Sequence, residues 1–168
     1  MASTTTLTLG QFLADYGAEN GYEYWFGEPV RKGMGTKSHS ILARVLESLL
    51  RACGYDAITE VDLCVDPEWR PRPDVMADLA TIERPYPTRP FGIVAEILSP
   101  DDRMSRVLAK CRNYVRVGIP RIFLLDPETR AIWEWDRSTS NLERIEELRL
   151  DIGTLTAATI WREFDSQR

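Results

Sequence analysis

The fold is decided by a segment that begins GIVAEILSP at residues 92–100 and ends RIFLL at residues 121–125. Each end is an almost continuous apolar run, which is typical of a strand buried on both faces of a sheet. Between the runs, six residues recur at helical spacing before Gly118 ends the pattern: Met104, Val107, Leu108, Cys111, Tyr114 and Val115. A strand, a helix and a strand in this order predict two parallel neighbouring strands joined by a right-handed crossover.

The start of this helix carries strong local signals. Ser99 is a capping residue, Pro100 suits the first helical position, and Asp101 and Asp102 place acids in the first turn. We therefore expect the helix to begin at Pro100 and to reach about Val117.

The flanking segments complete a mixed sheet. The expected elements are helices at residues 8–16 and 38–52, strands at residues 57–65 and 72–79, hairpins at residues 22–30 and 131–150, and a closing segment at residues 155–164. The fold class is α/β with a mixed sheet: a core of helix, three strands, helix and strand, with added N- and C-terminal hairpins.

Composition limits the classes of protein to which the chain can belong. The chain has 168 residues, a net charge of −5 and 43% hydrophobic residues, which predicts one domain over residues 1–168 and excludes a disordered or collagen-like chain. It has no secretory signal and no apolar run of about 20 residues, so we expect no membrane contact and a cytoplasmic location. His39 is the single histidine, which excludes a zinc site made of several histidines.

Two carboxylates are the candidate site residues. Asp74 follows Pro73 near a predicted strand, and Glu96 lies inside the most apolar strand, where an unpartnered carboxylate costs several kcal/mol. If the strands are neighbours, the two acids converge on one cation, and oxygen ligands favour Mg²⁺ or Mn²⁺ over Zn²⁺. A structural salt bridge between Glu96 and an arginine is the alternative.

Basic residues gather on the predicted helix after Glu96. Residues 101–121 hold six basic residues against two acids, and Arg31, Lys32 and Lys37 precede His39. If both segments face one cleft they neutralise phosphates; otherwise they form a solvated helix face. Lys110 lies at the edge of the apolar stripe, and its ammonium either enters a cleft or extends along the surface.

The order of these residues resembles a known family. Pro73-Asp74, then Glu96-Ile97-Leu98-Ser99-Pro100, then Lys110 with Tyr114, Gly118-Ile119-Pro120 and Asp126-Pro127 resemble the Uma2-type endonucleases of the PD-(D/E)XK restriction-endonuclease-like superfamily. The resemblance extends over most of the chain. It departs from the superfamily pattern at Leu98, where a lysine is usual, and Lys110 on the following helix is the matching position.

The resemblance implies a metal-dependent endonuclease that hydrolyses DNA. Asp74, Glu96 and Lys110 are then the catalytic residues, Asp74 and Glu96 bind Mg²⁺ or Mn²⁺, and His39 matches an accessory position. Lys37, Arg103 and Arg106 are the residues expected to bind nucleic acid.

Two points stay open at this stage. A catalytically inactive nuclease-fold protein that serves as a nucleic-acid-binding or assembly module is the alternative function. The aromatic residues of the hairpins form either the surface of a homodimer or part of the core: Tyr22, Tyr24, Trp25, Trp133 and Trp135.

Overall fold

The structure is a computed structural model that describes residues 6–17, 21–33 and 35–168. The helices are α1 (Leu9–Tyr16), α2 (Lys37–Ala52), α3 (Met104–Arg116) and α4 (Ala157–Ser166). The strands are β1 (Tyr22–Trp25), β2 (Glu28–Arg31), β3 (Asp56–Thr59), β4 (Trp69–Arg70), β5 (Val75–Asp78), β6 (Ile93–Ile97), β7 (Arg121–Asp126), β8 (Ala131–Asp136), β9 (Asn141–Ile145), β10 (Glu147–Arg149) and β11 (Thr154–Thr156).

A six-stranded mixed sheet forms the centre, in the order β3-β5-β6-β7-β8-β9. Strands β6 and β7 are parallel, with Glu96 paired to Leu124, and the other neighbours are antiparallel. The predicted parallel pair is therefore confirmed, and α3 is the helix that connects its two strands.

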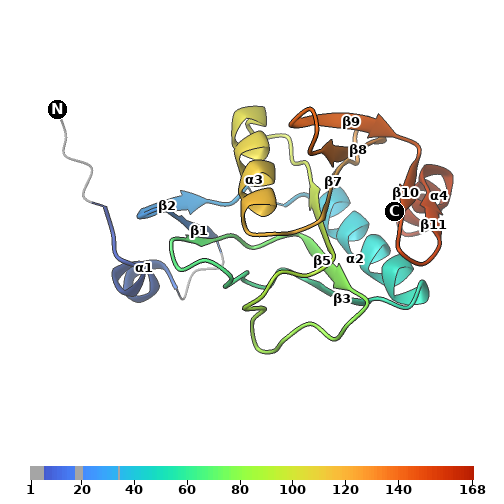
Figure 1. Ribbon diagram of the computed structural model, residues 1–168. Helices are drawn as coiled ribbons and strands as arrows, with labels where there is room; N and C mark the ends of the chain where they lie inside the picture. The colour runs from blue at the N-terminus through green and yellow to red at the C-terminus, as the bar shows by residue number, and fades with distance from the viewer. Residues whose placement is uncertain (1–5, 18–20, 34) are drawn as a thin grey trace.

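The sheet separates two hydrophobic cores, because successive side chains of a strand point to opposite faces. Val75, Ala95 and Phe123 pack against α2 and α4 on one face. Met76 and Val94 pack on the other face with Cys111 and Tyr114 of α3. Figure 1 shows α2 and α3 on opposite sides of β7. Asp74 and Glu96 keep the same alternation as Met76 and Val94, so both belong to the face that α3 covers.

A small sheet in the order β2-β1-β4 lies beside this centre and carries α1 (Figure 1). The predicted first hairpin is confirmed, with Tyr24 paired to Pro29. Tyr24 is buried and its hydroxyl donates to the carbonyl of Leu7. Trp135 of the second hairpin is buried as well. These two aromatic residues belong to the core, and the homodimer stays a prediction.

Three expected elements differ from the structure. The helix predicted from Pro100 begins at Met104, because Asp102 accepts a hydrogen bond from the backbone N–H of Ser99 and closes a turn before the helix. The strand predicted at residues 57–65 ends at Thr59, because Glu60 has a left-handed backbone (φ 56°). The strand expected at residues 142–150 divides into β9 and β10, and β10 pairs with β11 instead.

No helix in the described part of the chain has the length and apolar character that crossing a membrane requires.

Candidate functional site

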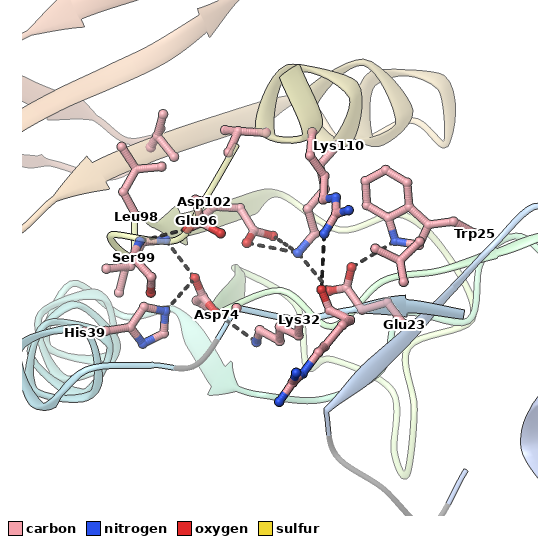
Figure 2. A pocket seen from close by; sticks show the side chains of 17 residues that line it. Glu23, Trp25, Lys32, His39, Asp74, Glu96, Leu98, Ser99, Asp102 and Lys110 are labelled. Carbon is pink, nitrogen blue, oxygen red and sulfur yellow. Dashed lines mark hydrogen bonds and ion pairs between the residues drawn. The ribbon is translucent and has the colours of Figure 1, made fainter. Parts of the chain in front are cut away.

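A pocket opens on the α3 face of the sheet, where β6 ends. Its lining comes from β1, β2 and the residues after it, α2, β6 and α3. Asp74, Glu96, Lys110 and His39 all line it, so the structure brings together the four residues predicted as catalytic or accessory. Figure 2 shows their side chains pointing toward one another across the pocket.

Asp74 is held in place from three directions. It precedes β5, and its Oδ2 atom accepts a hydrogen bond of 2.7 Å from the backbone N–H of Ile97 on the neighbouring strand. The same oxygen lies 3.1 Å from Nε2 of His39, and Oδ1 lies 2.9 Å from Nζ of Lys32. Burial raises the pKa of Asp74, but the hydrogen bond from His39 and the charge of Lys32 outweigh burial and hold the pKa below its ordinary value. Asp74 is therefore an anion at neutral pH.

His39 reaches Asp74 from the first turn of α2. Thr36 caps this helix by accepting a hydrogen bond of 3.1 Å from the backbone N–H of His39. The cap fixes the backbone from which the imidazole extends. Burial lowers the pKa of His39, but its hydrogen bond with Asp74 outweighs burial, and the net pKa is raised. The ring is thus a partner of the aspartate rather than a surface residue.

Glu96 is compensated by two side chains of α3. Nζ of Lys110 lies 2.9 Å and 3.0 Å from the two carboxylate oxygens, and the hydroxyl of Tyr114 donates to Oε1. The alternative of a structural bridge to an arginine is wrong, because the partner is a lysine. The alternative of a surface position for Lys110 is wrong too, because Lys110 is buried.

Lys110 also contacts a second acid, Glu23 of β1, at 2.8 Å. Glu23 accepts further hydrogen bonds from the indole N–H of Trp25 and from the backbone N–H of Arg72. One buried ammonium therefore faces two buried carboxylates. Burial raises the pKa of Glu96 to about 7, against the opposing charge of Lys110. Burial lowers the pKa of Lys110, but Glu23 and Glu96 outweigh burial and raise that pKa above its ordinary value.

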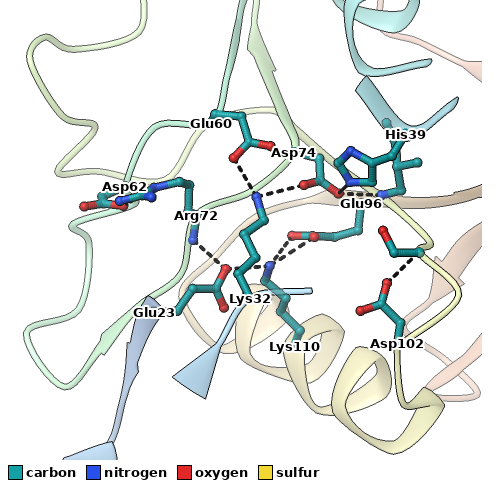
Figure 3. Close-up of polar contacts among 12 residues, drawn as sticks. Glu23, Lys32, His39, Glu60, Asp62, Arg72, Asp74, Glu96, Asp102 and Lys110 are labelled. Atoms are coloured by element: carbon teal, nitrogen blue, oxygen red, sulfur yellow. Dashed lines mark hydrogen bonds and ion pairs between the residues drawn. The ribbon is translucent and has the colours of Figure 1, made fainter. Parts of the chain in front are cut away.

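A second lysine pairs with the acids at the other side of the pocket. Nζ of Lys32, which directly follows β2, lies 2.7 Å from Oε2 of Glu60 and 2.9 Å from Oδ1 of Asp74 (Figure 3). Glu60 follows β3 in the left-handed conformation, which is uncommon for a residue other than glycine and often marks functional sites.

One group in the described part of the chain has the spacing of a metal site. His39, Glu60 and Asp74 each offer a ligand atom, and these atoms lie within 4.8 Å of one another. Glu96 lines the same pocket but is not a member of this group. Oδ1 of Asp74 is buried and lies 2.9 Å from the ammonium of Lys32, so this oxygen already faces a positive charge. Two carboxylates and one imidazole suit Mn²⁺ and, with water ligands, Mg²⁺.

The basic residues predicted to bind nucleic acid divide into two sets. Arg106 lines the pocket, and Arg103 and Arg106 line an adjoining hollow with Arg31 and Lys32. Lys37 is exposed at the start of α2 and lines neither of these hollows.

Sequence reasoning did not single out Glu23 and Glu60, and it treated Lys32 only as one of the basic residues before His39. Two of these three have a weak local signal. Glu23 is an acid within the aromatic run YEYWF, and Lys32 is one of three lysines in the chain. Glu60 lies inside the strand predicted at residues 57–65, and nothing in the sequence distinguishes it.

A mixed sheet between two helices, with acids gathered at the ends of its central strands, is the architecture of the restriction-endonuclease-like nucleases. The family model of Uma2, described as a putative restriction endonuclease, matches residues 9–158. The chain therefore belongs to the Uma2 family, and the family predicted from the sequence is confirmed.

Solved structures support the same fold. The crystal structure of a putative nuclease belonging to DUF820 from Anabaena variabilis has a TM-score of 0.76 and 18% sequence identity, covering 94% of this chain and 99% of that chain. The cryoEM structure of a DrdV-DNA complex has a TM-score of 0.38 and 14% identity, covering 73% of this chain and 10% of that chain, a likeness too low to bear on function. No curated protein matches the chain.

Proposed function

We propose that this protein is a metal-dependent endonuclease that hydrolyses phosphodiester bonds of DNA with Mg²⁺ or Mn²⁺. One observation carries the proposal: an ionised aspartate, a second buried acid and a buried lysine face one pocket in a chain of a nuclease family. Burying several charges costs free energy of folding even when they are paired, and clusters of this kind occur often at functional sites.

Asp74 and Glu96 are the proposed metal-binding pair, and His39 and Glu60 are further ligands on the side of Asp74. The donor set fits a hard cation, since it consists mainly of carboxylate oxygens, and Oδ1 of Asp74 already faces the positive charge of Lys32. Such an ion supplies a water of lowered pKa and neutralises charge on the phosphate.

Lys110 has a separate role in this proposal. Its Nζ atom lies 2.9 Å and 3.0 Å from the two carboxylate oxygens of Glu96, so it fixes the orientation of the second acid. The same buried positive charge lines the pocket, where it would stabilise negative charge that develops on a phosphate. Tyr114 keeps its proton, because burial and Glu96 raise the pKa of the phenol well above its ordinary value.

The test is nicking of supercoiled plasmid DNA by the purified protein. We expect relaxed and linear products with Mg²⁺ or Mn²⁺ and none with excess EDTA, and activity that returns when the metal is restored. Binding to the plasmid without cleavage under every metal condition would support the alternative, a nuclease-fold module that binds nucleic acid without catalysing hydrolysis.

Arg103 and Arg106 are proposed to contact the DNA backbone beside the pocket, and Lys37 to contact it further out. Replacing both arginines with alanine should weaken binding to a short duplex about tenfold or more, and should lower the slope of log affinity against log salt by about 2. Fluorescence anisotropy of a labelled duplex at several salt concentrations measures both effects.

The matched control for this experiment is Arg162→Ala, which removes an exposed arginine from α4. If the double variant and this control bind the duplex with the same affinity and the same salt slope, the arginines of α3 are a solvated face and not a DNA contact.

A further inference from the structure

The ammonium of Lys32 lies where a cation would enter the site. Its Nζ atom is 2.7 Å from Glu60 and 2.9 Å from Asp74, two of the three residues whose ligand atoms fall within 4.8 Å of one another. Figure 3 shows the end of this side chain between the two carboxylates. A cation bound by Asp74 and Glu60 and this ammonium therefore compete for the same space.

The contact with Asp74 is a buried ion pair. Oδ1 of Asp74 is buried, and Nζ of Lys32 lies 2.9 Å from it. Lys32 therefore supplies the positive charge at this oxygen in the absence of metal. A divalent ion has twice the charge of an ammonium and can bind several carboxylate oxygens at once, so it can replace Lys32 at this position.

A second position is available to the end of the Lys32 side chain. Its side chain lines the site pocket and also the adjoining hollow, where Asp101 and Asp102 supply carboxylates and Arg103 and Arg106 are neighbours. A lysine side chain is a flexible four-carbon stem with a compact charge, so its end can move between two nearby positions while the backbone stays in place.

We propose that Lys32 occupies the metal position of the site when no metal is bound, and that a divalent cation displaces its ammonium into the adjoining hollow. The inference rests on the metal dependence proposed above. It adds a competing internal cation, which lowers the affinity for metal. It also moves a positive charge toward Arg103 and Arg106 when the metal enters, on the side where the DNA backbone is expected.

The first test measures metal affinity without any activity. Isothermal titration of Mn²⁺ alone into Lys32→Met, which keeps a long apolar side chain, should show binding about tenfold tighter than in the wild type, a usual size for the coupling between two competing ligands. The control is Arg162→Met, which removes one positive charge from the surface of α4 and should leave Mn²⁺ affinity unchanged.

The second test follows Lys32 in the wild-type protein, so it does not depend on the folding of a variant. The chain has three lysines, and ¹⁵N labelling of lysine gives few Nζ signals to resolve. The Lys32 signal, assigned by its loss in Lys32→Arg, should shift when Mg²⁺ is added, while the signal of Lys37, which is exposed and lines neither hollow, moves little.

The outcomes separate the two proposals. In one outcome the wild type binds metal, Lys32→Met does not bind metal more tightly, and the Lys32 signal does not shift. The proposed displacement of Lys32 is then wrong, whereas the proposed metal site is supported. If neither the wild type nor Lys32→Met binds Mn²⁺, the metal site fails and the displacement fails with it.

Discussion

Asp74→Asn should lower metal-dependent nicking of plasmid DNA by about 10³-fold or more, at or above the usual cost of losing one electrostatic contact in an active site. The amide is neutral, so it cannot provide the anionic ligand that the proposed metal requires. It keeps the shape of the side chain, and its oxygen can still accept the hydrogen bond that Ile97 donates to Asp74. Mn²⁺ binding measured by titration should be lost together with the activity.

The matched control for this prediction is Asp15→Asn, the same change at an exposed position of α1 outside the pocket. It should leave both metal binding and nicking unchanged. Circular dichroism and thermal melting verify that both variants are folded. Full activity of folded Asp74→Asn, or unchanged Mn²⁺ affinity, would refute the assignment of Asp74. Glu96→Ala should likewise abolish nicking, because Glu96 is the second proposed ligand.

The sheet could be predicted from sequence because its signals are local. The run from Ile93 to Ile97 is buried at every position, and this is what an uninterrupted apolar strand indicates. The same run made Glu96 conspicuous, since a charge in a doubly buried strand needs a partner. Asp74 and Lys110 were candidates from their positions beside a predicted strand and at the edge of a helix stripe, and the family resemblance gave them catalytic roles. The structure brings all three into one pocket.

The rest of the site depends on contacts that no short pattern encodes. Lys110 and Glu23 are 87 residues apart in the chain, and their pairing exists only after the small sheet has packed beside α3. The position of the Glu60 side chain depends on the left-handed backbone of Glu60 itself, directly after β3. At the start of α3 a local signal was misleading. Ser99 and Pro100 are typical of a helix start, but Asp102 closes a turn with Ser99, and the helix begins only at Met104.

Lys110→Met should lower the free energy of unfolding by about 3–5 kcal/mol near pH 7.5, because removing one partner of a buried ion pair leaves the other charge uncompensated. Here two carboxylates, Glu23 and Glu96, lose the same ammonium, which contacts them at 2.8–3.0 Å. Denaturation by urea measures the difference. Arg112→Met is the matched control, because it removes an exposed positive charge from the same helix and should change the stability little.

The pH dependence of this loss distinguishes charge imbalance from a simple packing defect. Burial raises the pKa of Glu96 from an ordinary value of 4.5 to about 7 even with Lys110 present, and removal of the ammonium raises it further. A carboxyl whose pKa is higher in the folded state favours folding most below its unfolded pKa, and this contribution is lost as the pH rises through the folded value. The stability deficit of Lys110→Met relative to the wild type should therefore shrink as the pH falls from 8 to 5.

A second substitution, Glu96→Gln, in the Lys110→Met protein should recover part of the stability at pH 7.5, because it removes one of the two unpaired acids. A deficit that is independent of pH and unaffected by Glu96→Gln would mean that Lys110 stabilises the fold through its methylene groups alone.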